Sequence, residues 1–238
     1  MRRAVVILGR NSKFAAALLI VAVMAALTFS VLWQGSVAVN TRYQKQYSLV
    51  IDAGHGGYDP GAVTKQGIYE KEINLRVAKK VAELLRPGGI RVTLTRDEDE
   101  DYVPDGLTGK TTKKQIDLNY RIAIAAETKA DLFVSLHVNA EAGGKKSGAE
   151  TFFYDGSTSG KGLAECIQQE LIKIPGMNRR AAKPADFYIL RNTGMPAVIV
   201  ELGYLSNPTE QNKLRQHWYQ DQLAQAVAKG IAVFLEKK

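Results

Sequence analysis

The chain has 238 residues, a hydrophobic content of 45% and a formal net charge of +8. This length and composition predict one globular domain with a sizeable core and a short appendage. Because Cys166 is the only cysteine, an intramolecular disulfide is excluded and stability must come from the core. Four of the positive charges lie before residue 40, where there are no acidic residues, and the mild excess that remains predicts no nucleic-acid partner.

The N-terminal region has the pattern of a membrane segment. Residues 14–33 carry no charge, are almost wholly apolar and are long enough to span a bilayer core of about 30 Å as a helix. The basic segment 1–13 before them is expected to stay in the cytoplasm, so that the rest crosses. A cleavable signal peptide is the alternative, because Ser36-Val37-Ala38 is a fair cleavage site, but the apolar stretch is long for one. Both interpretations place the folded part outside the cytoplasm.

A linker, residues 34–47, leads to a domain expected at 48–238. Short apolar runs predict strands at residues 49–51, 90–94, 132–136, 151–154 and 197–200. Helical periodicity predicts helices at residues 71–86, 116–127, 161–173 and 218–235, the first of them stopped by Pro87-Gly88-Gly89. Alternation of strands and helices predicts a single α/β domain with a largely parallel sheet.

The segment after the first expected strand is the most informative part of the domain. His55 lies there among glycines in D-A-G-H-G-G, residues 52–57, followed by D-P-G at 59–61. Glycines in such a loop indicate that backbone must approach something closely. A histidine at a strand end of an α/β sheet is placed for metal binding or catalysis.

Three further polar residues are expected at the same edge of the sheet. His137 is expected to end the strand 132–136, Glu201 to end the strand 197–200, and Glu70 to open the helix that follows the His55 loop. Carboxyl ends of strands in an open α/β sheet meet in one crevice, and helix N-termini commonly face the same side. These four residues are therefore predicted to form one site.

Two histidines and one carboxylate are a known ligand set of catalytic zinc, which leaves the fourth position for water. Zinc lowers the pKa of that water toward about 7 and polarises the carbonyl group under attack. A second carboxylate that is free of the metal can take the proton of the water and deliver it to the leaving nitrogen. The sequence offers this division with His55, Glu70 and His137 as ligands and Glu201 as the acid/base.

Each residue also has a structural interpretation. Glu70 could simply place a favourable charge at a helix N-terminus, and Glu72 is an alternative ligand, although a solvated helix position fits it better. Glu201 could cap the following helix or pair with Arg191. His217 has no glycine-rich setting and is expected at the surface. Cys166 is expected to be a buried, inert thiol on a helix.

Four sequence blocks resemble the zinc-dependent N-acetylmuramoyl-L-alanine amidases, in the order of that family. They are D-A-G-H-G-G at 52–57 with D-P-G at 59–61, E-K at 70–71 with N-L at 74–75, S-L-H-V-N-A at 135–140 and V-E-L-G-Y-L-S-N at 200–207. The resemblance implies that His55, Glu70 and His137 bind zinc and that Glu201 is the catalytic acid/base. It also implies a twisted sheet flanked by helices, and cleavage of the amide between the lactyl group of muramic acid and L-alanine in peptidoglycan.

Within the family the chain is similar to the germination-type amidases of spore formers, which act on spore-cortex peptidoglycan. One membrane segment, one catalytic domain and the stretch K-K…D-L…R at residues 113–121 carry this similarity. It implies sequential action with a separate muramic acid deacetylase, which forms muramic δ-lactam, and it leaves room for a regulatory protein. Tyr204, where many relatives carry Phe, is a conservative departure.

Other functions remain as alternatives. A vegetative cell-wall amidase would use the same residues, and a zinc peptidase acting on the stem peptide would use the same ligand chemistry. A wall-binding module would not need the free base Glu201. A phosphate-binding loop is disfavoured, because Gly109-Lys110-Thr111 would need a glycine where Pro104 stands.

Overall fold

The computed structural model describes residues 46–104, 106 and 111–238. The expected membrane segment 14–33 and nearly all of the expected linker lie outside these residues. Within the described residues, no helix combines the length and the apolar character needed to cross a bilayer.

In residues 46–104 and 111–238, six strands form one mixed sheet in the order β2-β1-β3-β6-β4-β5. Neighbouring strands are parallel except β4 and β6, which are antiparallel. The strands are β1 (Ser48–Ala53), β2 (Arg91–Leu94), β3 (Leu132–Asn139), β4 (Glu150–Phe153), β5 (Lys183–Pro184) and β6 (Ala197–Tyr204).

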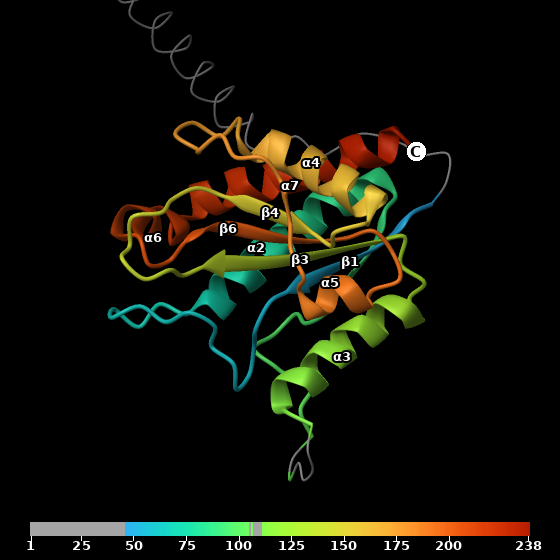
Figure 1. Ribbon diagram of the computed structural model, residues 1–238, viewed down its shortest axis with the longest axis horizontal. Helices are drawn as coiled ribbons and strands as arrows, with labels where there is room; N and C mark the ends of the chain where they lie inside the picture. The colour runs from blue at the N-terminus through green and yellow to red at the C-terminus, as the bar shows by residue number, and fades with distance from the viewer. Residues whose placement is uncertain (1–45, 105, 107–110) are drawn as a thin grey trace, which may run out of the picture. The chain divides into compact units, whose positions relative to one another are not determined.

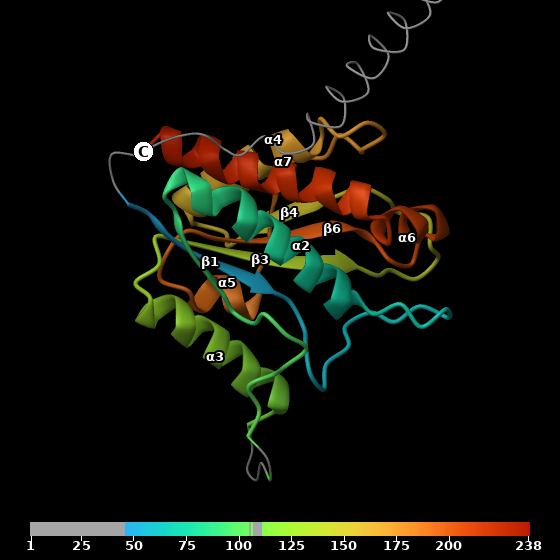
Figure 2. The same ribbon diagram turned by 180° about the vertical axis from the view of Figure 1, so that it is seen from behind.

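Helices cover both faces of this sheet (Figures 1 and 2). They are α2 (Glu70–Leu85), α3 (Lys113–Glu127), α4 (Thr158–Leu171), α5 (Tyr188–Asn192), α6 (Pro208–Leu214) and α7 (His217–Glu236), with a short 3-10 turn at Arg86–Gly88. α2, α4 and α7 pack together on one face, and α3 and α5 lie on the other. The sheet is therefore the middle layer of three.

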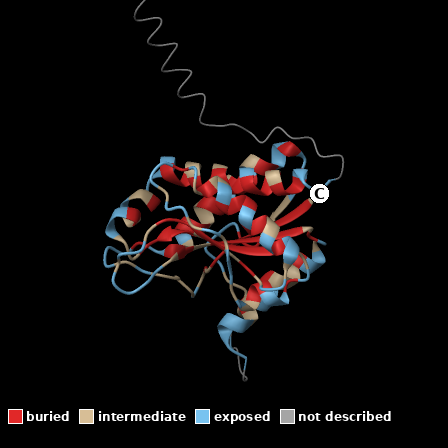
Figure 3. Cartoon of the chain, turned by 45° about the horizontal axis from the view of Figure 1, so that its top comes forward, coloured by how far each residue is buried: buried red, intermediate tan, exposed pale blue. Residues whose placement is uncertain are grey.

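The two faces of the sheet bury separate apolar cores. The larger core joins β1, β3 and β6 to α2, α4 and α7, through residues such as Leu49, Leu136 and Val200. The smaller core lies under α3 and α5 and contains Val50 and Phe133. Most strand residues are buried between the helical layers (Figure 3). Because side chains alternate between faces along a strand, both cores come from the same strands.

The expected α/β domain is confirmed, and so is the largely parallel sheet. All five expected strands and all four expected helices are present, with ends that differ by a few residues. Three strands, β1, β3 and β6, are longer than expected. His137 lies inside β3 and Glu201 lies inside β6, so the expectation that these two residues end their strands is wrong.

The face toward α3 and α5 has an apolar half and a polar half. Along β3, Phe133 belongs to the smaller core, whereas the later residues of the same face are Ser135 and His137. Along β6, Ile199 is followed on that face by Glu201. The helices α3 and α5 thus cover the first halves of β3 and β6. The second halves of these two strands carry polar side chains on the same face.

Candidate active site

His55 lies in the loop that follows β1. Its backbone has a positive φ of 64°, which is uncommon for a residue other than glycine. The buried Arg121 holds this conformation, because its Nη2 donates to the carbonyl oxygen of His55 at 2.8 Å. The Nδ1 atom of the ring lies 2.8 Å from Oδ2 of Asp59, so Nε2 is the nitrogen that faces the site.

Glu70 is the first residue of α2 and is buried. Its Oε2 accepts a hydrogen bond from the backbone of Ala62 at 2.8 Å, and its Oε1 accepts one from Val138 at 3.0 Å. These contacts fix the carboxylate between the His55 loop and β3. Glu70 therefore does more than place a charge at a helix N-terminus.

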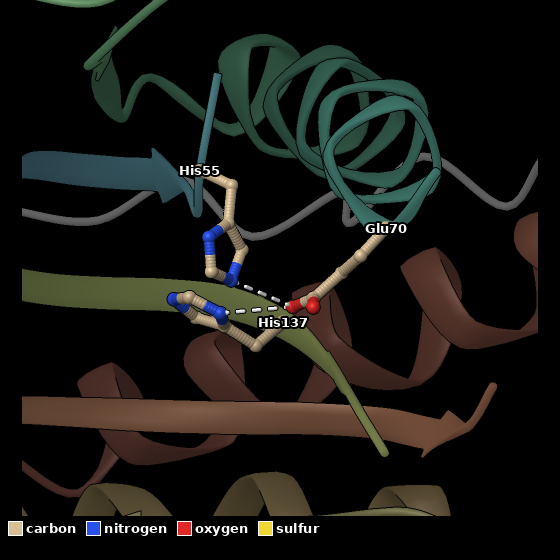
Figure 4. A group of neighbouring side chains, drawn as sticks. All are labelled: His55, Glu70 and His137. Carbon is tan, nitrogen blue, oxygen red and sulfur yellow. Dashed lines mark hydrogen bonds and ion pairs between the residues drawn. The ribbon is translucent and has the colours of Figure 1, made fainter. Parts of the chain in front are cut away.

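His55, Glu70 and His137 meet at one point (Figure 4). Oε1 of Glu70 lies 3.1 Å from Nε2 of His55 and 3.1 Å from Nδ1 of His137. One donor atom from each residue lies within 4.8 Å of the others, which is a geometry that could hold a metal ion. The three residues come from the β1 loop, the start of α2 and β3, as the sequence predicted.

Glycines make room for these side chains. A Cβ on Gly54 would lie 2.2 Å from Nε2 of His137, and one on Gly61 would lie 2.6 Å from Oε2 of Glu70. Real Cβ atoms do not approach other atoms so closely, so larger residues would displace the donors. The glycines of the His55 loop are thus explained by the close approach that the sequence indicated.

His55 and Glu70 each stabilise the charged form of the other. Although burial opposes it, hydrogen bonds with Asp59 and Glu70 raise the pKa of His55 to about 9. Burial would raise the pKa of Glu70, but hydrogen bonds with His137 and His55 hold it well below its usual range. The buried carboxylate of Glu70 is therefore ionised and favours a positive charge beside it.

Glu201 lies next to His137, because β3 and β6 pair these two residues in register. Its Oε2 atom is buried and has no hydrogen-bond partner among the residues that the structure describes. Burial raises the pKa of Glu201 to about 7, and the nearby Glu70 adds to this effect. A carboxyl group with a pKa near neutrality can both accept and donate a proton at physiological pH.

Three of the four residues line one cleft of about 290 Å³, and the fourth, Glu70, contacts two of them. His55, His137 and Glu201 line it, and Glu70 lies behind the two histidines. The opposite wall is largely apolar and comes from α3 and α5, with Leu118, Phe187, Tyr188 and Ile189. A substrate in this cleft would contact Glu201 and the metal-binding cluster at the same time.

A buried network of ion pairs between Arg121, Asp52 and Asp117 lies next to the cleft. Arg121 on α3 lies 2.6 Å from Oδ1 of Asp52 and 2.8 Å from Oδ2 of Asp117. Asp52 also accepts hydrogen bonds from Thr95 and Ser135. This network joins β1, β3 and α3 directly beneath the His55 loop.

A second buried arginine holds the same loop from the other side. Nε of Arg96 donates to the carbonyl oxygen of Ala53 at 2.9 Å, and its Nη2 donates to those of Gly54 at 3.1 Å and Lys71 at 2.8 Å. The loop that carries His55 is thus fixed by two arginines.

Other residues considered from the sequence lie outside the site. Glu72 is half exposed and lies 3.6 Å from Arg76, outside the metal-binding cluster. Arg191 pairs with Asp186 rather than with Glu201, and the side chain of Asn207 caps α6. His217 is exposed, and Cys166 is a buried free thiol on α4, both as expected.

Several supporting residues were not predicted as part of the site. Asp59 is one, although it stands four residues after His55. The network of Asp52, Asp117 and Arg121 is another, although Asp117 and Arg121 have the spacing of neighbours on a helix. Phe187 precedes α5, a helix of five residues that is too short to give a periodic signal.

Comparison with known proteins identifies the family. Residues 49–233 match the family model described as N-acetylmuramoyl-L-alanine amidase. This chain belongs to the N-acetylmuramoyl-L-alanine amidase family. It is an amidase that acts on peptidoglycan, and the matched residues contain the whole site described above.

Relatives with this activity resemble the amidase over most of its length. It is 35% identical over 191 residues to the germination-specific N-acetylmuramoyl-L-alanine amidase of Bacillus subtilis, covering 80% of each chain. The CwlD amidase of Clostridioides difficile, solved in complex with the GerS lipoprotein, matches with a TM-score of 0.77 and 37% identity, over 81% of this chain and all of that one. The amidase LytC of Bacillus subtilis is 37% identical over 79% of this chain and 35% of its own length.

Proposed function

We propose that this amidase is a zinc hydrolase in which His55, Glu70 and His137 hold the metal and Glu201 is the catalytic acid/base. The observation that carries the proposal is the arrangement of these residues around one cleft. Three donor atoms meet, and Glu201, whose buried oxygen lacks a partner within the described ranges, lines the same cleft.

The donor set fits zinc. Two imidazole nitrogens and one carboxylate are the ligands of many catalytic zinc ions. His55 would bind through Nε2 and His137 through Nδ1, because these nitrogens face Glu70. Asp59 would support the ligand His55 through its other ring nitrogen, as carboxylates commonly do for zinc-bound histidines.

When bound, zinc would polarise the scissile carbonyl group and lower the pKa of a water molecule. The residues of the chain do the rest. Glu201 accepts the proton of the attacking water and delivers it to the nitrogen of the departing L-alanine. Arg121 and Arg96 hold the His55 loop in place through hydrogen bonds to its carbonyl oxygens.

The bond cleaved would be the amide between the lactyl group of N-acetylmuramic acid and L-alanine. Mass spectrometry of purified peptidoglycan after digestion tests this assignment. Free stem peptides that begin with L-alanine, together with peptide-free glycan, are the expected products. Shortened peptides that stay attached to muramic acid would instead support the second candidate, a zinc peptidase, which the same ligand set allows.

The natural substrate would be spore-cortex peptidoglycan. The resemblance to a germination-specific amidase over 80% of both chains supports this proposal. Removal of the peptide would prepare muramic acid for a separate deacetylase and for formation of muramic δ-lactam. A deletion strain should make spores whose cortex lacks δ-lactam and whose muramic acids keep their peptides. Normal δ-lactam levels would contradict the cortex assignment and favour a vegetative cell-wall amidase.

The catalytic domain, residues 48–238, would act outside the cytoplasm, in a spore former between the two forespore membranes. Residues 1–13 would remain in the cytoplasm, residues 14–33 would form the membrane anchor and residues 34–47 the linker. A reporter fused after Lys238 should be active only outside the cytoplasm. A mature protein that begins at Val39 would show a cleaved signal peptide instead.

A regulatory partner is also proposed. The solved CwlD amidase is in complex with a lipoprotein, and this chain resembles it over that whole structure. A lipoprotein on the same side of the membrane would meet the anchored domain. Co-purification of the full-length protein from sporulating cells after crosslinking tests this proposal, and recovery of the amidase alone would contradict it.

A further inference from the structure

The polar half of the sheet face continues beyond Glu201 toward the edge formed by β4 and β5. Glu150 on β4 pairs in register with Glu201 on the antiparallel strand β6, so both side chains lie on the same face. Oε1 of Glu150 lies 2.9 Å from Nε of Arg180 and 3.3 Å from Nζ of Lys183. A row of polar groups thus runs across the strands from His137 to Lys183.

The two basic residues differ in what they can still bind. Arg180 also donates to the carbonyl oxygens of Ser147 and Gly148, so most of its donors are used. Lys183 has a side chain that is 51% exposed, and its ammonium group uses one of three donors on Glu150. Since Glu150 carries one negative charge against these two positive charges, the edge keeps an excess positive charge.

The distances suit a peptide that starts at the scissile bond. Neighbouring strands lie about 4.8 Å apart, so β5 is roughly 10 Å from Glu201 across β4. An extended peptide advances about 3.4 Å per residue, so the second and third residues of a stem peptide would lie about 7–10 Å from that bond. In peptidoglycan these are the positions that carry free carboxylates or their amides.

The wall of the cleft formed by α3, which packs near β1 and away from β5, suits the glycan better. Leu118 on α3 makes this wall apolar, whereas Phe187 lies nearer β5, because its ring contacts Phe152, the residue that pairs with Lys183. Asp59 and Asp117 also line the cleft. A hydrogen bond with His55 lowers the pKa of Asp59, and the positive charge of Lys114 adds to this effect. An uncharged sugar would be accepted beside this wall, where the carboxylates of Asp59 and Asp117 are already paired with His55 and Arg121.

We infer that Lys183 is a specificity-determining residue that binds a free carboxylate on the second or third residue of the stem peptide. This inference rests on the proposed cleavage of the lactyl–alanine amide. Lys183 touches neither the metal-binding cluster nor Glu201 in the contacts described above, so it acts on substrate choice and not on the chemical step.

The test uses the zinc-loaded full-length protein and three disaccharide-peptides, which differ only in amidation. One has both carboxylates free, one is amidated at the second residue and one at the third. Lys183→Gln removes the charge, and Lys183→Arg keeps it. Lys173→Gln is the matched control, because Lys173 is an exposed lysine that pairs with Glu170 at the end of α4.

The wild-type enzyme should cleave the free substrate roughly fivefold more efficiently than one of the amidated substrates, mainly through a lower KM, as expected for a solvent-exposed charge pair. The amidated substrate that is disfavoured identifies which carboxylate is bound. Lys183→Gln should remove this preference and leave zinc content and cleavage of the disfavoured substrate unchanged. Lys183→Arg should keep the preference for the free substrate, and Lys173→Gln should match the wild type.

A Lys183→Gln enzyme that keeps the preference would overturn the inference, and so would an equal loss on all three substrates. Loss of the preference in Lys114→Gln instead would place the peptide on the other side of the cleft. Failure of the wild-type enzyme to release peptide from any of the three would instead overturn the proposed cleavage itself.

Discussion

His137 and Glu201 occupy paired positions on the neighbouring parallel strands β3 and β6. Both side chains therefore lie on the same face of the sheet. One belongs to the metal-binding cluster, and the other has a carboxylate oxygen without a partner in the described part of the chain. Backbone hydrogen bonds fix the separation of the two strands. The separation between the proposed ligand His137 and the proposed base Glu201 is thus set by the pairing of two strands.

The first prediction concerns metal content. His55→Ala and His137→Ala each remove one of three protein ligands, so bound zinc should fall well below one ion per chain. Elemental analysis of the purified proteins gives the answer. His217→Ala is the matched control, because His217 is an exposed histidine on α7 and its loss should leave zinc unchanged. Full occupancy in both ligand variants would contradict the assignment.

The second prediction concerns Asp59, which lies 2.8 Å from the ring nitrogen of His55 on the side away from the cluster. Asp59→Asn keeps the shape of the side chain but removes its charge. Loss of such a supporting carboxylate typically weakens metal affinity by about 10–100-fold. Competition with a chelator measures this change. Asp155→Asn, at an exposed position, should bind zinc like the wild type.

The third prediction concerns the buried pair of Asp52 and Arg121. Burial would raise the pKa of Asp52, but the charge of Arg121 and a hydrogen bond from Ser135 lower it below its usual value. A carboxylate with a lowered pKa stabilises the fold above its unfolded pKa of about 3.9, and this stabilisation is lost as the pH falls further. Asp52→Asn should therefore lower the free energy of unfolding at pH 7 by about 3 kcal/mol.

Urea unfolding at pH 7 and at pH 3 measures both parts of this prediction. The difference between wild type and Asp52→Asn should shrink at the lower pH, because below about 3.9 the unfolded wild-type chain takes up a proton at Asp52, whereas the lowered pKa keeps this carboxylate ionised longer in the folded protein. Asp221→Asn is the control, since Asp221 forms a partly exposed ion pair with Lys80 and should change stability by less than about 1 kcal/mol. A difference that grows as the pH falls would show that the pair does not stabilise the fold.

Much of the site could be predicted from sequence, because its residues follow apolar runs in short glycine-rich or polar blocks. His55 after residues 49–51 and His137 after residues 132–136 are examples. The exact ends of strands could not be predicted. The apolar pattern stops where the sheet face changes from core to cleft, but the backbone pairing of β3 and β6 continues past it.

Partners distant in sequence were harder to predict. Asp52 and Arg121 are 69 residues apart, and only the packing of α3 against β1 brings them together. The strand β5 has two residues and the helix α5 has five, so neither gives a periodic pattern. The antiparallel direction of β4 depends on how the chain turns between residues 139 and 150, which local sequence does not determine.

The central claim is that three residues bind zinc while Glu201 transfers the proton. Glu201→Gln tests it most directly, because this substitution keeps the volume of the side chain and removes only the base. The measurement is the rate of peptide release from purified peptidoglycan by zinc-loaded protein, with the zinc content of the same sample. The account predicts one zinc ion per chain and a rate lowered by about 10²–10⁴. A Glu201→Gln protein that keeps its activity, or that has lost its zinc, would contradict the account.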